Sequence, residues 1–343
     1  MTKTKIICTI GPASGNEIIL SEMIDAGMNI ARLNFSHGTY ADHAEKIAMI
    51  KNVRERKNIP LPIMLDTKGP EFRIKTFANC KITLNAGDSF TFTTENIIGD
   101  KSRVSVTFKE LCDQMLPGDK ILLNTGLMAF EVVRVQKPNV ICKTIIGGEL
   151  SDRKSMYFPD KALKMTYLSE QDKSDIKFGY EQGVDFFALS FVSRAQDVLD
   201  VRNWLKACGA SEGDIQLIAK IENREGVNNI EEILEVSDGI IVARGDLGVE
   251  VPYEMLPSIQ KKLVKICNIH GKRSMIATEM LESMIKQSRP TRAEISDVAN
   301  AVYDGASAIM LTGETAEGAY PVEAVKAMTK IARQAELDIV QND

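Results

Sequence analysis

Two apolar runs that each stop at charged residues constrain this chain more than any other feature. The runs are Leu217–Ile221 and Gly239–Ala243, both rich in Ile and Val. Short apolar runs of this kind are typical of strands buried on both faces, although a buried helix segment has a similar composition. Between them, apolar residues recur at helical spacing from Val227 to Leu234. The pattern predicts a strand–helix–strand unit with a parallel pair of strands.

Four charged residues stand where these two strands end. In parallel α/β units, ligands collect at the carboxyl ends of the strands. Glu222 and Asp246 can share one hard cation there, with water and substrate oxygens in the remaining positions. Lys220 and Arg244 add positive charge nearby. This set predicts a phosphorylated or carboxylated substrate bound through Mg²⁺, and solvated loop charges are the less specific alternative.

Length, composition and charge narrow the class of protein. A chain of 343 residues suggests about two domains, and 44% hydrophobic with 26% charged residues is ordinary for a soluble globular protein. A net charge of −5 argues against nucleic acid as a partner. No apolar stretch is long enough to span a membrane, and the first residues lack a signal peptide. The six cysteines form no Cys-x-x-Cys pair, so we expect a reduced, cytoplasmic location.

Strand and helix patterns alternate along most of the chain, which places it in the α/β class. Helix starts are marked by capping-box spacing at Ser14–Glu17, Ser169–Asp172 and Thr291–Glu294. Eight strand–helix units close into a (β/α)8 TIM barrel. An open doubly wound sheet is the alternative, but no strand is followed by a Gly-x-Gly-x-x-Gly turn. The predicted strands are Lys5–Ile10, Asn29–Leu33, Pro62–Leu65, Asp185–Phe191, Gln216–Ile221, Gly239–Val242, Ser274–Ala277 and Ala308–Leu311.

Helical spacing disappears between about residue 71 and residue 167. Short alternating segments replace it, separated by turn signals such as Pro117-Gly118-Asp119. The predicted strands of this region are Lys81–Leu84, Ser89–Thr93, Arg103–Thr107, Lys120–Leu123, Ala129–Val135 and Val140–Thr144. This change predicts an all-β domain inserted after the third barrel strand. We therefore expect a catalytic barrel formed by residues 1–70 and 168–343. Residues 71–167 would form a lid domain that excludes water from the site.

Polar residues also follow the other barrel strands and would meet at the same face. Arg32 and Lys220 can hold a phosphate, the first by its planar fork and the second as a point charge. Backbone N–H groups at Gly245 can bind a carboxylate. Oxygen ligands for a monovalent cation follow strands two and three, although loop capping is the simpler interpretation of Asn34 and Ser36. The remaining strand-end residues are Asp66, Thr67, Ser190 and Thr278.

Five longer motifs surround these strand ends: Ala31–Gly38, Leu65–Glu71, Lys220–Asn223, Ala243–Gly248 and Ala277–Met284. Together they are far more specific than any single motif, and they resemble the pyruvate kinase family over nearly the whole chain. The resemblance implies phosphoryl transfer from phosphoenolpyruvate to ADP, giving pyruvate and ATP. It also implies Mg²⁺ (or Mn²⁺) and K⁺ as cofactors.

The resemblance assigns a role to each strand-end residue. Lys220 resembles the group that stabilises the phosphoryl group and the enolate, and Arg32 resembles the phosphate-binding arginine. Glu222 and Asp246 match the Mg²⁺ ligands. The other implied roles are the K⁺ site for Asn34, Ser36, Asp66 and Thr67, K⁺ dependence for Glu71, substrate contacts for Ser190, Gly245, Asp246 and Thr278, and nucleotide contacts for His37, Arg73 and Asn34.

Several positions depart from the family pattern. Gln171 stands where a nucleotide-contacting lysine is usual, and Asn124-Thr125 replaces an Asp-Asp pair of the lid. Ser155 and Tyr157 lie in a stretch that is usually Lys-Gly-x-Asn-Leu-Pro. These differences bear on lid closure and ADP affinity more than on phosphoenolpyruvate binding. The chain ends soon after its last barrel helix, so we expect a homodimer through the barrel and no sugar-phosphate activation.

Two other functions stay open from the sequence. One is a barrel lyase that acts on pyruvate or phosphoenolpyruvate through Mg²⁺, because a Glu/Asp metal pair serves enolates generally. The other is a non-catalytic relative that binds a ligand or partner and regulates. The Asp66–Glu71 motif and the β insertion favour the kinase over the lyase. The intact set of strand-end charges argues against a non-catalytic protein.

Overall fold

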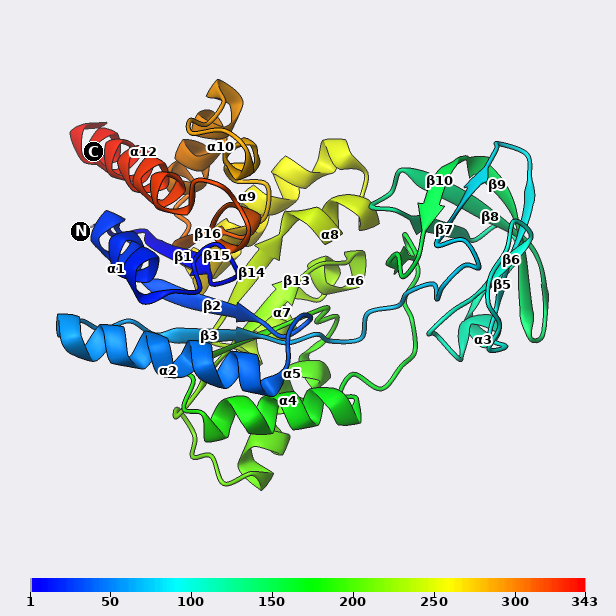
Figure 1. Ribbon diagram of the computed structural model, residues 1–343, viewed down its shortest axis with the longest axis horizontal. Helices are drawn as coiled ribbons and strands as arrows, with labels where there is room; N and C mark the ends of the chain where they lie inside the picture. The colour runs from blue at the N-terminus through cyan, green and yellow to red at the C-terminus, as the bar shows by residue number, and fades with distance from the viewer. Residues whose placement is uncertain (1, 343) are drawn as a thin grey trace.

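The computed structural model describes residues 2–342 and contains a closed barrel of eight parallel strands (Figure 1). Around the barrel the strands follow the order β1-β16-β15-β14-β13-β12-β3-β2, so each strand pairs with its neighbour in the chain once the insertion is passed over. The predicted (β/α)8 barrel is confirmed. Its strands are β1 Lys5–Thr9, β2 Ile30–Asn34, β3 Ile63–Asp66, β12 Phe186–Leu189, β13 Gln216–Ile221, β14 Gly239–Ala243, β15 Arg273–Ala277 and β16 Ala308–Leu311.

Helices follow the barrel strands and form the outer ring. No helix among residues 2–342 is both long enough and apolar enough to cross a membrane. The α-helices are α1 Glu17–Ala26, α2 Tyr40–Lys57, α3 Leu111–Gln114, α4 Glu170–Glu181, α5 Ala195–Ala207, α6 Arg224–Asn228, α7 Ile230–Val236, α8 Arg244–Glu250, α9 Leu256–Ile269, α10 Arg292–Tyr303, α11 Gly313–Ala316 and α12 Pro321–Asn342, with 3₁₀ turns η1 Tyr253–Met255 and η2 Glu282–Ile285.

Two of the three predicted capping boxes are confirmed. Ser169 caps α4 with Asp172, and Thr291 caps α10 with Glu294. The prediction at Ser14 is wrong. Asn16 caps α1 instead, by accepting a hydrogen bond from the backbone of Ile19. The Ser14 hydroxyl accepts from the backbone N–H of Gly11, so it closes the preceding turn before the helix begins.

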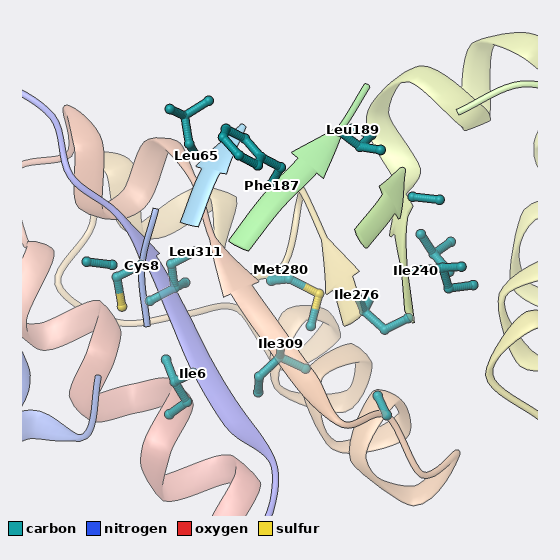
Figure 2. Packing of buried hydrophobic residues seen from close by; sticks show 14 of the residues in the cluster. Ile6, Cys8, Leu65, Phe187, Leu189, Ile240, Ile276, Met280, Ile309 and Leu311 are labelled. Carbon is teal, nitrogen blue, oxygen red and sulfur yellow. The ribbon is translucent and has the colours of Figure 1, made fainter. Parts of the chain in front are cut away.

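Residues along the barrel strands alternate between two apolar layers, as the pleat of a strand requires. The inner layer fills the barrel and includes Ile7, Ile241 and Met275. The outer layer packs under the helices, and Figure 2 shows part of it, including Ile6 and Phe187. Because both faces are apolar, each strand reads as a continuous hydrophobic run.

The chain between β3 and α4 forms two further sheets. In Figure 1 they stand to one side of the barrel and are joined to it by extended connections. Three rings pack at the centre of this insert: Phe92 lies 5.4 Å from Phe90 and 5.3 Å from Phe130, between ring centroids. The strands are β4 Lys81–Leu84, β5 Ser89–Thr93, β6 Arg103–Ser105, β7 Lys120–Leu123, β8 Met128–Gln136, β9 Asn139–Ile146, β10 Gly148–Ser151 and β11 Met156–Tyr157.

Two strands of the insert lie outside the sequence prediction. β10 pairs with β4, and the two-residue β11 pairs with β7. Both are short, and β11 lies on the path by which the chain returns to the barrel. A two-residue strand has too few positions to display a period of two, so alternation could not identify it.

The insert has its own apolar cluster, distinct from the two layers of the barrel. We therefore predict that Phe130→Ala, at a fully buried position, removes about 3–5 kcal/mol of stability from the insert alone. Amide hydrogen exchange should accelerate in β5, β8 and β9 and stay unchanged in the barrel strands. The matched variant Phe187→Ala, in the outer barrel layer, should give the opposite pattern. Uniform acceleration in both variants would show one cooperative core.

Candidate functional site

A cavity of about 280 Å³ opens at the carboxyl ends of the barrel strands, where connections from the insert also reach it. Twelve of the residues selected from the sequence line it, although they come from six strand ends and one segment of the insert's outgoing connection. Thr67 and Gly245 are not among the lining residues. The twelve are Arg32, Asn34, Ser36, His37, Asp66, Glu71, Arg73, Ser190, Lys220, Glu222, Asp246 and Thr278.

Asp66, at the end of β3, is the centre of this arrangement. Its Oδ2 accepts a hydrogen bond from Arg32 Nε at 2.7 Å, while Oδ1 lies 3.0 Å from Lys220 Nζ and 3.1 Å from Ser190 Oγ. Burial raises the pKa of the Asp66 carboxyl, but the charges of Arg32 and Lys220 outweigh burial and hold the pKa below its ordinary value. One buried carboxylate thus connects side chains from three other strands.

Lys220 lies between two carboxylates inside the barrel mouth. Its Nζ is 3.1 Å from Glu222 Oε1 as well as 3.0 Å from Asp66 Oδ1, and it donates to Ser190 Oγ at 2.7 Å. Burial lowers the pKa of this amine, but the two neighbouring carboxylates more than compensate and raise the pKa above its ordinary value. Lys220 therefore carries a fixed positive charge, which suits contact with an anion.

Glu222 is buried at the end of β13, with 1% of its surface exposed. Its Oε2 accepts the backbone N–H of Phe191 at 2.7 Å, so both carboxylate oxygens have fixed neighbours. Burial and the nearby Asp246 carboxylate raise the pKa of Glu222, against the opposing effect of Lys220. A raised pKa in a carboxyl group at a strand end indicates a site that favours added positive charge.

Asp246, in the first turn of α8, completes the set of acidic groups. Its Oδ1 accepts a hydrogen bond from the Tyr157 hydroxyl at 2.8 Å. Within residues 2–342 no group of three or more His, Cys, Asp or Glu is arranged to hold a metal. Two carboxylates without further protein ligands match Mg²⁺, which usually keeps water and substrate oxygens in its other positions. Glu222 and Asp246 therefore fit such a cation.

The residues expected to bind K⁺ are only partly assembled. Asn34 and Ser36 line the cavity, and Asn34 Oδ1 accepts the backbone N–H of Ser36 at 3.0 Å. Thr67 directs both of its oxygens towards Ser190: the hydroxyl accepts the Ser190 N–H, and the carbonyl accepts the Ser190 hydroxyl at 2.7 Å. Loop capping by Asn34, the simpler interpretation from the sequence, is thus also present.

On the side of the insert, Glu71 and Arg73 form a two-point ion pair. Arg73 Nε and Nη2 lie 2.8 and 2.7 Å from the two Glu71 oxygens, and Ser155 Oγ donates to Glu71 Oε1 at 2.5 Å. Arg73 also donates to the carbonyl of Arg153. His37 lines the same cavity and is exposed. The ion pair with Glu71 thus holds the Arg73 guanidinium at the outer rim of the site.

The backbone is strained just after two barrel strands. The backbone φ angles of Phe191, Thr278 and Glu279 are 56°, 70° and 54°, values that residues other than glycine rarely adopt. Such conformations persist only where surrounding contacts fix them, and they concentrate at functional sites. Here the N–H of Gly245 donates to the Thr278 hydroxyl at 2.8 Å, so this contact also closes the end of β15 against α8.

Arg244 does not supply positive charge to the cavity, contrary to the prediction from the sequence. Its guanidinium pairs with Asp297 at 2.8 and 2.7 Å and donates to the carbonyls of Thr278 and Glu279. It is buried and lies outside the lining of the cavity. Arg244 therefore fixes the strained turn after β15.

Two residues, Thr9 and Tyr157, contact side chains of the site although the sequence analysis gave neither of them a role there. The Thr9 hydroxyl accepts a hydrogen bond from Arg32 Nη1 at 2.7 Å. Tyr157 reaches Asp246 from the insert. Thr9 ends the first strand, a position that signals a site residue in any barrel. Tyr157 carried no such signal, because its approach to Asp246 depends on how the insert packs.

An eight-stranded α/β barrel with a cluster of paired charges at its strand ends defines a barrel protein with the site layout of an enzyme. Comparison with protein families is more specific. The model of the pyruvate kinase barrel domain matches residues 1–325. The chain belongs to the pyruvate kinase family, as the motifs had indicated.

Individual relatives support the same assignment. A pyruvate kinase of Clostridium perfringens (strain 13 / Type A) is 48% identical over 343 residues, covering 100% of this chain and 72% of the relative. A pyruvate kinase of Geobacillus stearothermophilus is 49% identical, covering 99% of this chain and 58% of the relative. One of Clostridium acetobutylicum is 47% identical, over 99% and 72% respectively. The chain thus spans between about half and three quarters of these relatives.

We predict that Asp66→Asn lowers the free energy of unfolding by about 3–5 kcal/mol at neutral pH, because it leaves Arg32 and Lys220 buried without their shared charge. The lowered pKa means that this contribution is complete above the ordinary aspartate pKa of about 3.9 and is lost only as pH falls through the lower folded value. Urea denaturation at pH 7 measures it. Asp25→Asn, at the exposed pair with Lys57, should cost at most about 1 kcal/mol.

Proposed function

We propose that this chain transfers the phosphoryl group of phosphoenolpyruvate to ADP, giving pyruvate and ATP. The observation that carries the proposal is the position of Lys220, a buried cation between Asp66 and Glu222 at the mouth of the barrel. Phosphoryl transfer depends on positioning and on positive charge around the moving group. Family membership supports the same reaction.

In this proposal Arg32 and Lys220 hold the phosphoryl group from two sides. Both are already fixed by Asp66, so little reorganisation accompanies substrate binding. During transfer the bond from the enol oxygen to phosphorus breaks, and a bond from an ADP β-phosphate oxygen forms. Lys220 then faces the enolate left behind, whose negative charge it stabilises. A proton added to the enolate carbon completes pyruvate.

Glu222 and Asp246 would hold Mg²⁺, which when bound neutralises charge on the phosphoryl oxygens. Three carboxylates, Asp66, Glu222 and Asp246, stand beside two buried cations, Arg32 and Lys220, so a divalent cation there would reverse the charge of this inner part of the cavity. Over the whole lining, Lys68, Arg73 and Glu71 bring the count to four cations and four carboxylates. Asn34, Ser36, Asp66 and the carbonyl of Thr67 would supply oxygens for K⁺. The three carboxylates in this inner part of the cavity support a requirement for cations before an anionic substrate binds.

The remaining assignments concern the two ends of the substrates. Gly245 N–H and the Thr278 hydroxyl, now bonded to each other, would turn to the substrate carboxylate. His37, Arg73 and Asn34 would contact the nucleotide at the rim of the cavity. Residues 1–70 and 168–343 would form the catalytic barrel, and residues 71–167 a lid. The two separate apolar cores support this division.

We predict that Lys220→Met lowers the rate of ADP-dependent pyruvate formation by at least about 10³-fold, because one preorganised cation at a transferring phosphoryl group has an effect of this size. The raised pKa of Glu222 lets that group take up a proton and offset part of the lost charge, so circular dichroism should show a folded protein. Lys272→Met, whose amine donates to the carbonyl of Ser237, is the control and should keep the rate within twofold, roughly, since its contact is remote from phosphoryl transfer. Pyruvate formed equally fast without ADP would instead indicate lyase chemistry.

We predict that turnover depends on K⁺ and falls when tetramethylammonium replaces it, because that ion is too large for a site of carboxylate and amide oxygens. Glu71→Lys adds a fixed cation beside this site and should reduce the ratio of the two rates. Glu149→Lys, at an exposed ion pair of the insert, is the matched control and should leave the ratio unchanged. Equal rates in both salts for the unmutated chain would contradict the assignment.

A further inference from the structure

The chain that returns from the insert to the barrel donates hydrogen bonds to three carboxylates in four residues. Ser155 Oγ donates to Glu71 Oε1 at 2.5 Å. Tyr157 OH donates to Asp246 Oδ1 at 2.8 Å, and Phe158 N–H donates to Glu250 Oε1 at 3.0 Å. Asp246 and Glu250 both belong to α8, the short helix that follows β14. The return segment, residues 155–158, therefore fastens the insert to the helix that carries a proposed cation ligand.

Of these three contacts, that of Tyr157 is made to Asp246, the proposed cation ligand. The side chain is buried, with 6% of the residue exposed, although it belongs to the insert strand β11. Among residues 2–342 Asp246 Oδ2 makes no hydrogen bond, which leaves that oxygen available for a cation.

The two acidic groups of the site are held in the same way. Glu222 receives the N–H of Phe191 on one oxygen, from the strained turn after β12. Asp246 receives the Tyr157 hydroxyl on one oxygen. In each case a donor fixes the direction in which the carboxylate presents its other oxygen. Partners of this kind orient metal ligands, and their loss typically weakens metal affinity by about 10- to 100-fold.

We propose that Tyr157 is a positioning residue for Asp246, through which docking of the insert and binding of a divalent cation favour each other. The inference rests on the proposed role of Asp246 as a cation ligand and adds the group that orients it. Without the phenol, Asp246 rotates freely at the edge of the cavity and binds the cation less tightly. By reciprocity, a bound cation stabilises the return segment in its docked position by the same free energy.

The decisive experiment titrates Mn²⁺ into the full chain and follows free Mn²⁺ by electron paramagnetic resonance, with no substrate present. Tyr157→Phe removes one oxygen and keeps the ring, so the packing of β11 is preserved. The expected result is about 10- to 100-fold weaker Mn²⁺ binding. Unchanged affinity would overturn the proposal, and so would tighter binding, because the phenol would then compete with the cation.

Two controls separate this role from general effects. Tyr303→Phe removes a phenol–carboxylate hydrogen bond of the same kind, to Asp338 on the outside of the barrel, and should leave Mn²⁺ affinity unchanged. Glu250→Ala loosens the same return segment at Phe158 without touching Tyr157 or Asp246, and should change affinity far less than Tyr157→Phe. Equal weakening in either control would overturn the specific role of the hydroxyl.

A further pair of measurements distinguishes failure of this inference from failure of the proposed function. Asp246→Ala should abolish the Mn²⁺ site; if it binds as tightly as the unmutated chain, the ligand assignment itself is wrong. Hydrogen exchange of the peptide that contains residues 155–158 should slow when Mn²⁺ is added, and this protection should be lost in Tyr157→Phe. Protection that persists in the variant would show that the cation and the insert are coupled by another route.

Discussion

The buried carboxylate of Asp66 is the interaction on which the site depends. It lies at the end of β3 and contacts Arg32 from β2, Lys220 from β13 and the hydroxyl of Ser190, the residue that follows β12. Each of these cations would be costly to bury alone, because an unpaired charge loses its hydration. Shared between two of them, one carboxylate fixes both at the mouth of the barrel. Their positive charges are then in place before an anion arrives.

The neighbouring acids bear on the proposed divalent cation. Glu222 is nearly inaccessible, and its burial, with the nearby Asp246 and Asp66 charges, raises its pKa despite the contact with Lys220. A cation bound in the proposed manner would offset this penalty. The strained turns at Phe191 and Thr278 serve the same arrangement, since they bring backbone groups to Glu222 and to α8.

The insert is tied to the barrel, because its return segment contacts α8 at Asp246 and Glu250. Its own aromatic core gives it independent packing. The contacts of the return segment to the barrel are polar and fall on α8. Independent packing allows a domain to move as a unit, while hydrogen bonds to specific carboxylates fix its docked position. The proposed lid could in this way respond to what the site contains.

The sequence by itself determined the barrel. Continuous Ile and Val runs that end in charged residues admit few other folds, and the strand-end rule then placed Arg32, Asp66, Lys220 and Glu222 together. This worked because local hydrophobic patterning sets strands and helices, and closure brings their carboxyl ends to one face. Sequence also located the insert, and its motifs identified the family.

Only the tertiary structure decided which charged residues face the cavity. Arg244 and Lys220 both stand at strand ends, but Arg244 turns outward to Asp297 whereas Lys220 turns inward to Asp66. Spacing along one strand cannot tell these outcomes apart, because the partner comes from a distant part of the chain. The same holds for Tyr157, which reaches Asp246 across 89 residues. Contacts of this kind depend on how separate elements pack, and so they appear only when the chain has folded.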